Sequence, residues 1–225
     1  MRFPVALVLA VVLAGLAGRA HTSESPRTSS PAARAFSDAR SLNETVLRLA
    51  LNAAACARRA GAVANDRLLT VIDYSKASTE PRLWVLDLER QRVLFEELVA
   101  HGRGSGENFA TRFSNREGSH QTSLGLFRTA DTYVGSNGYS LRLDGLEAGV
   151  NDRARERAIV MHGAPYVSEF NLRTVGRLGR SHGCPALRPA IARTVIDTIK
   201  QGSLVFAYYP DKQWLQGSRF LNGCS

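Results

Sequence analysis

The sequence predicts a mainly β, α+β domain. Short runs dense in β-branched, aromatic and leucine residues recur along the chain, and such runs are typical of strands. Amphipathic helical segments occur only near the start of the domain and near its end, which favours an α+β arrangement over alternating β and α units. The chain beyond residue 40 is long enough for one hydrophobic core. We therefore expect one folded domain over residues 41–225, with no internal repeat.

Two segments precede this domain. Residues 1–20 have the layout of a secretory signal peptide, in which Arg2 precedes an apolar run and small residues follow it. The apolar run is shorter than the roughly 20 residues of a membrane-spanning helix, so cleavage near Ala20 is favoured over an uncleaved anchor. Residues 21–40 are rich in Ser, Thr, Pro and Arg and predict a disordered tether. We expect an exported protein of the periplasm or cell envelope, without stable membrane insertion after cleavage.

The charge of the chain bears on its partners. The formal net charge is +9, and loss of residues 1–20 removes Arg2 and Arg19 and leaves +7. Nucleic acid is not expected as a partner, because no Lys/Arg cluster is interleaved with aromatic residues. An anionic cell envelope fits a basic exported protein better.

One helix opens the predicted domain. The sequence Ser41-Leu-Asn-Glu44 matches a capping box, and apolar residues then fall on one helical face until Gly61. Residues 68–75, 82–89 and 91–100 predict strands, the last two as a hairpin.

A long loop divides the strands into two groups. Residues 101–123 are rich in Gly, Ser and Asn, and loops of this length in compact domains are usually functional or disordered. Residues 190–200 predict a helix that Gly202 ends, and residues 203–210 predict a buried strand. Three further strands are predicted between the loop and this helix, with the sequences LGLFRT, YSLRLDGL and AIVMHG.

Cys184 stands between Gly183 and Pro185 in the segment GRLGRSHGCPALRP. Proline is suited to the first turn of a helix, so the sequence predicts that Cys184 lies at a helix N-terminus. The free N–H groups there favour a thiolate, which is the nucleophilic form of cysteine. The backbone amides of Gly183 and Cys184 are the candidate oxyanion hole.

Two histidines are candidates for the base that a nucleophilic cysteine needs. His162 ends the strand AIVMHG, and His182 precedes Cys184 by two residues. An imidazole at a strand end faces a cleft more freely than one in a tight turn, so we favour His162. Either the carbonyl of Gly163 or Ser181 is expected to hold its second ring nitrogen.

These cysteine and histidine residues allow three other interpretations. In the first, Cys184 is half of a disulfide, which is the default for an exported cysteine. Cys56 and Cys224 make a pair without it, however, which leaves Cys184 as the odd one out of three cysteines, although a buried reduced Cys56 is the alternative. Either histidine, taken alone, fits a purely structural role. Zinc is disfavoured because no fourth ligand follows a recognisable metal-site spacing.

The residues around Cys184 resemble a known family. The motif Ser-His-Gly-Cys, with a histidine 22 positions before its cysteine, is similar to the signature of the murein L,D-transpeptidase catalytic domain family. The resemblance covers roughly residues 41–222. Further segments that resemble the family are QTSLGLF, YSLRLDGLE, IVMHGAPYVS, GRLGRSHGCPAL and FAYYPDK.

The resemblance implies a β-sandwich or barrel with a few flanking helices, and a cysteine enzyme that acts on peptidoglycan stem peptides. Cys184 is the implied nucleophile, His162 the base and Gly163 its backbone partner, while Ser181 and His182 line the site. The implied reaction releases D-alanine from a stem tetrapeptide and passes the acyl group to an amine. No cofactor or metal is implied, and a monomer is expected. An L,D-carboxypeptidase, with water as acceptor, and a non-catalytic envelope-binding domain remain alternatives.

The sequence departs from the commoner family pattern directly after the cysteine. There the family has an aliphatic residue and then an arginine that helps to bind substrate, whereas this chain has Pro185 and Ala186. The residues proposed instead as substrate-binding are Gly183, Arg188, Arg180, Arg142 and Tyr139. Arg142 fits a solvated strand face equally well.

Overall fold

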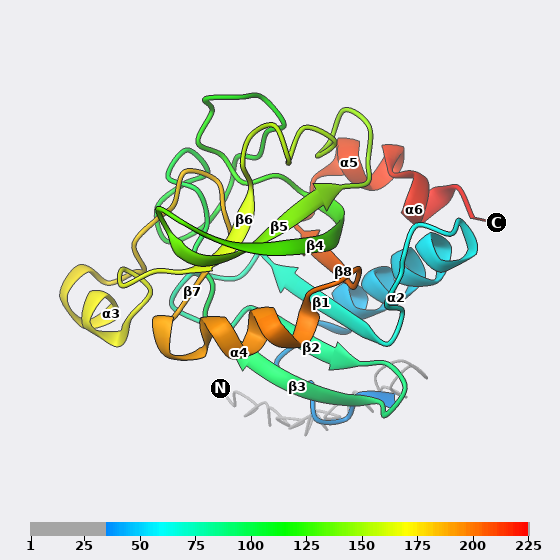
Figure 1. Cartoon of the computed structure of the whole chain (residues 1–225), viewed down its shortest axis with the longest axis horizontal. Coiled ribbons are helices and arrows are strands. Elements are labelled where there is room, and N and C mark those ends of the chain that lie inside the picture. The colour runs from blue at the N-terminus through cyan, green and yellow to red at the C-terminus, as the bar shows by residue number, and fades with distance from the viewer. Residues whose placement is uncertain (1–34, 225) are drawn as a thin grey trace, which may run out of the picture.

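The computed structural model describes residues 35–224, which form one eight-stranded sheet and five helices (Figure 1). The predicted signal peptide and the first part of the predicted tether lie outside the described residues. The strands are β1 (Leu68–Asp73), β2 (Leu83–Asp87), β3 (Arg92–Glu97), β4 (Gly125–Gly135), β5 (Gly138–Gly145), β6 (Val160–Gly163), β7 (Ala186–Leu187) and β8 (Leu204–Tyr208). The helices are α2 (Glu44–Arg59), α3 (Glu169–Val175), α4 (Pro189–Ile199), α5 (Lys212–Gly217) and α6 (Arg219–Asn222).

The sheet is mainly antiparallel and nearly closes on itself. Its strand order is β3-β2-β1-β8-β4-β5-β6-β7, with parallel pairing only at β1–β8 and β6–β7. An isolated antiparallel bridge between Ala100 and Ala186 joins the chain just after β3 to β7, the opposite edge strand. The predicted mainly β fold, and the hairpin formed by β2 and β3, are confirmed.

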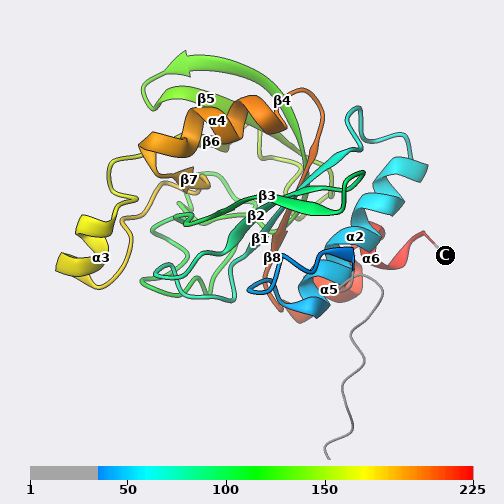
Figure 2. The same cartoon turned by 90° about the horizontal axis from the view of Figure 1, so that it is seen from below.

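Two amphipathic helices bury their apolar faces against the sheet. Helix α2 packs against β1 and β8, and α4 packs against β6. Val195, Ile196 and Ile199 of α4 are fully buried, and each such side chain contributes about 2 kcal/mol by leaving water. Helix α3 has no buried residue and projects from the body beside β7 (Figure 2).

The start of α2 differs from the predicted capping box. Asn43, not Ser41, is the N-cap, and its Oδ1 accepts from the N–H groups of Thr45 (2.9 Å) and Val46 (3.3 Å). The Ser41 hydroxyl instead donates to Glu96 and accepts from Trp84 Nε1. The helix therefore begins two residues later than the motif indicates, because Asx side chains cap helices as well as serine does.

The folded part of the chain begins before residue 41. Phe36 and Ala39, which lie within the predicted tether, are each 5% exposed and belong to the main core. Asp38 accepts a hydrogen bond from the N–H of Val93 on β3 (2.8 Å). These contacts tie the chain before α2 to the edge of the sheet.

A disulfide joins Cys56 on α2 to Cys224, with their Cα atoms 5.5 Å apart. The expected pairing is confirmed, and Cys184 is the free cysteine of the three. In residues 35–224 no helix combines the length and the apolar character needed to cross a bilayer.

The prediction that Cys184 lies at a helix N-terminus is wrong. Pro185 leads into β7, and α4 begins only at Pro189, with Arg188 as its N-cap. Proline suits either context, and here the pairing of β7 with β6 decides the outcome. No helix dipole therefore acts on the thiol in the way the sequence predicted.

Candidate active site

Residues 181–184, here called the Cys184 turn, are held in place by the side chain of Ser181. The Ser181 hydroxyl accepts from the N–H of Gly183 (3.1 Å) and donates to the carbonyl of Cys184 (2.6 Å). The Ser181 backbone pairs with the start of the long loop, because its N–H donates to His101 O (3.0 Å) and its carbonyl accepts from Arg103 N–H (2.8 Å). Ser181 thus fixes the turn that presents Cys184, and it does not hold the ring of His162.

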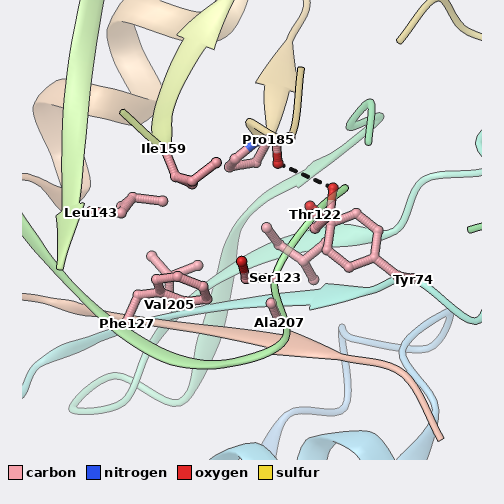
Figure 3. A pocket seen from close by; sticks show the side chains of 11 residues that line it. Tyr74, Thr122, Ser123, Phe127, Leu143, Ile159, Pro185, Val205 and Ala207 are labelled. Atoms are coloured by element: carbon pink, nitrogen blue, oxygen red, sulfur yellow. Dashed lines mark hydrogen bonds between the residues drawn. The ribbon is translucent and has the colours of Figure 1, made fainter. Parts of the chain in front are cut away.

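The hydroxyl of Thr122 also holds the turn in place. Thr122 Oγ1 accepts from the N–H of Gly102 (2.9 Å) and donates to the carbonyl of Gly183 (3.1 Å) (Figure 3). A Cβ on Gly102 would lie 2.8 Å from the Gly183 Cα, so only glycine permits this approach. Tyr74 and Pro185 help to line a cavity of about 10 Å³ behind the turn, just large enough for one water. The backbone of the turn is therefore rigidly placed.

Cys184 is a buried thiol at rest. Its side chain is 8% exposed, and its Sγ lies 3.6 Å from the carbonyl oxygen of Ala158. Burial raises the pKa of the thiol, while the N–H of Val160, the charge of Arg157 and its own N–H act in the opposite direction. The sequence-based expectation of a low pKa for Cys184 is therefore wrong for the resting structure, in which burial favours the neutral thiol.

His162 lies on β6, beside the Cys184 turn. Its N–H donates to the carbonyl of Pro185, the residue after Cys184 (3.4 Å), and β6 pairs it with Ala186. Its Nδ1 lies 2.9 Å from the carbonyl oxygen of Gly163. A carbonyl only accepts, so Nδ1 carries the proton and the lone pair of Nε2 is left free. Burial lowers the pKa of His162, which keeps the imidazole neutral and able to accept a proton.

His182 has a different neighbourhood. It is exposed, and its ring lies against that of His120, with the centroids 4.4 Å apart. His120 Nδ1 accepts from Arg103 Nε (2.8 Å). The two imidazoles line a surface pocket of about 300 Å³ together with Ala158, whose carbonyl faces Cys184. His182 therefore lines the approach to the site.

Only part of the predicted oxyanion hole is free. The N–H of Gly183 is occupied by Ser181 Oγ, whereas the N–H of Cys184 lies close enough to its own sulfur to favour the thiolate. A positive φ of 127° at Gly183 gives the turn a shape that glycine alone adopts readily.

The remaining predicted substrate-binding residues contact other parts of the chain. Tyr139 donates to Asp197 (2.7 Å) and so ties β5 to α4. The three arginines are each paired with a carboxylate: Arg188 with Glu97 (2.7 Å), Arg180 with Glu107 (2.6 Å) and Arg142 with Asp131 (2.9 Å). Each of these four side chains thus makes its polar contact with a residue other than Cys184.

Arg157 is a residue at the site that the sequence reasoning missed. It is half-buried, lines the pocket with His120 and His182, and interacts electrostatically with Cys184. The segment NDRARERA offers several arginines without a motif to distinguish them. Within residues 35–224, no three His, Cys, Asp or Glu side chains converge as metal ligands.

Fold and site together define a mainly β domain in which a free cysteine comes just before β7, and β7 pairs with the strand of a histidine whose ring is held by a carbonyl. The model of the family described as L,D-transpeptidase catalytic domain matches residues 38–208. The chain belongs to this family.

Several solved structures are similar to the chain. An L,D-transpeptidase from Mycobacterium smegmatis is 16% identical over 64% of this chain and 59% of that one, with a TM-score of 0.39. An L,D-transpeptidase from Xylanimonas cellulosilytica is 19% identical over 63% and 60%, with a TM-score of 0.36. The helical cell shape determining protein Pgp2 from Campylobacter jejuni is 13% identical over 64% and 48%, with a TM-score of 0.42. The chain thus spans less than two thirds of each structure, and a comparison with curated proteins gave no match.

Proposed function

We propose that this protein is an exported, cysteine-dependent peptidoglycan L,D-transpeptidase. Membership of the family supports the reaction class. The observation that carries the assignment of residues is the hydrogen bond from His162 Nδ1 to Gly163 O, beside the strand that follows Cys184. This bond leaves Nε2 free to act as a base.

The first half-reaction forms a thioester. His162 Nε2 takes the thiol proton as Cys184 Sγ attacks the carbonyl of the third stem-peptide residue, and an S–C bond forms. The resulting oxyanion is stabilised by the N–H of Cys184. The C–N bond to the terminal D-alanine then breaks, and its amine leaves with the proton from His162.

The second half-reaction transfers the acyl group. An amine of a second stem peptide or of a protein attacks the thioester and loses a proton to His162, an amide C–N bond forms and the C–S bond breaks, and His162 returns the proton to the sulfur to restore the thiol. Water in place of the amine would release a tripeptide, which is the carboxypeptidase outcome. Ser181 and Thr122 keep the turn in place through both steps because they fix the Gly183 and Cys184 carbonyls.

Peptidoglycan outside the cytoplasmic membrane is the proposed partner and location. The net charge of +7 after loss of residues 1–20 favours an anionic envelope, and the disulfide between Cys56 and Cys224 fits an oxidising compartment. We propose a monomer, with no nucleic-acid partner and no cofactor.

The test is mass spectrometry of a disaccharide-tetrapeptide incubated with the mature protein or with its Cys184→Ala variant. Dimers lacking one D-alanine, made only by the wild type, are the expected result. Tripeptide alone would replace the proposal with a carboxypeptidase, and unchanged substrate would favour an envelope-binding domain. An acyl-enzyme on the Cys184→Ala variant would refute the assignment of the nucleophile.

His162→Gln separates the two candidate bases. We expect at least a hundredfold loss of acyl-enzyme formation, as is typical when a general base is removed. His182→Gln is the matched control, with a much smaller expected loss. The reverse order of the two losses would assign the base to His182.

A further inference from the structure

Arg157 carries a charge that the chain does not neutralise. Its guanidinium donates to the carbonyls of Ser114 (2.7 Å) and Gln121 (2.6 Å), and to the hydroxyls of Ser123 and Ser119. All four acceptors are neutral. Among residues 35–224 no carboxylate oxygen lies within ion-pair distance of Arg157, although the side chain is half-buried. A partly desolvated cation with neutral partners favours an anion as its ligand.

The neighbouring charges are arranged differently. The three arginines proposed from the sequence all have carboxylate partners, as described above. Glu117 and Glu156, which lie at the rim of the same pocket, are both engaged by Arg153, at 3.8 Å and 2.9 Å. Arg153 thus offsets the acidic rim, and Arg157 supplies the cation that faces the site.

Arg157 lies beside the Cys184 turn. A Cβ placed on Gly183 would lie 3.6 Å from its Nη2. The next residue along the chain, Ala158, accepts the thiol of Cys184 at its carbonyl. The pocket of about 300 Å³ that Arg157 lines also includes His182, two residues before the nucleophile. An anionic group one residue away from the attacked carbon therefore falls within reach of the guanidinium.

We propose that Arg157 forms a carboxylate-binding subsite, which takes the free terminal carboxylate of the donor peptide. The identity of the donor rests on the proposed function. In a tetrapeptide this carboxylate belongs to the residue directly after the attacked carbonyl, and consecutive Cα atoms are about 3.8 Å apart. A guanidinium pairs with a carboxylate through charge-assisted hydrogen bonds. The subsite discriminates against donors in which the residue after the attacked carbonyl ends in an amide instead of a free carboxylate.

The first test needs no peptidoglycan. Iodoacetate and iodoacetamide alkylate the same thiol, share a leaving group and differ in charge. Cys184 is the free cysteine of the chain, so its alkylation rate is measured directly. We expect Arg157→Gln to lower the ratio of the iodoacetate rate to the iodoacetamide rate by about tenfold, the equivalent of one charge-assisted bond.

Two variants separate charge from structure. Arg157→Lys keeps the charge but loses several hydrogen bonds, so it should retain most of the rate ratio. Arg48→Gln, at an exposed position of α2, changes the net charge equally and should leave the ratio unchanged. Equal ratios in the wild type and Arg157→Gln would overturn the proposal.

The second test uses the wild type alone and so does not depend on how the variants fold. A tetrapeptide with a free carboxylate should protect Cys184 from iodoacetamide at about one tenth of the concentration that its C-terminal amide needs. Equal protection by the two peptides would refute the subsite. If neither peptide protects while the alkylation ratios behave as expected, the proposed donor is wrong and carboxylate binding at Arg157 stands.

Discussion

The disulfide between Cys56 and Cys224 should contribute a large part of the free energy of unfolding. The two cysteines are 168 residues apart in the sequence. In the chain-entropy model, a crosslink that closes a loop of this length lowers the entropy of the unfolded chain by about 17 cal/mol/K, or about 5 kcal/mol at 25 °C. The free energy of unfolding of a domain is about 5–15 kcal/mol in total. The crosslink should therefore supply a third or more of it.

The perturbation is Cys224→Ser in a Cys184→Ala background. Cys224→Ser leaves the buried Cys56 in place, and Cys184→Ala prevents the freed Cys56 thiol from pairing with Cys184. The assay is urea unfolding followed by circular dichroism. With a slope of about 2 kcal/mol/M, a loss of about 5 kcal/mol should lower the midpoint by about 2.5 M. Reduction of the Cys184→Ala parent should reproduce the loss without any change in core volume. A loss below about 1 kcal/mol in both experiments would refute the loop-entropy argument.

Three further predictions concern single side chains. Arg67 lowers the pKa of Asp87 to about 2 through their hydrogen bond. Because the native state holds this proton less tightly than the unfolded chain, the free energy of unfolding should fall as pH drops from about 4 to 2. The urea midpoint of the Asp87→Asn variant should fall less over the same pH range. Burial raises the pKa of Cys184, so its iodoacetamide rate should reach half-maximum above the pH found for a free cysteine, and a midpoint near neutrality would contradict this. Thr122→Val leaves the N–H of Gly102 and the carbonyl of Gly183 without their hydrogen-bond partner and should lower the free energy of unfolding by about 1–3 kcal/mol. An unchanged thermal unfolding midpoint would count against the role of this hydroxyl.

Local patterns in the sequence predicted the elements that depend on neighbouring residues. The apolar face of α2 and the runs of strand-forming residues in β2 and β3 lie within short windows, so local patterns located these elements. The cap of α2 shows the limit of such motifs. Asn43 and Ser41 are both good N-caps, and the contacts of Ser41 with Glu96 and Trp84, far along the chain, leave the capping role to Asn43.

The motif indicates which residues form the candidate site, but it does not indicate the electrostatic surroundings of Cys184. Cys184, His162 and Gly163 follow from a motif, and the structure places His162 and Gly163 on β6, which pairs with β7 just after Cys184. The expected helix N-terminus failed because the pairing of Ala186 with β6 is a long-range contact that no local pattern encodes. Arg157 was missed for the same reason, since its position depends on how the long loop folds against it.

The order of the sheet has a consequence for when the thiol acquires its surroundings during folding. Strand β1, near the start of the domain, pairs with β8 near its end, and Ala100 bridges Ala186, two residues after Cys184. Contacts of such high sequence separation form late and slowly. The sheet can therefore close around Cys184 only when nearly the whole domain is present.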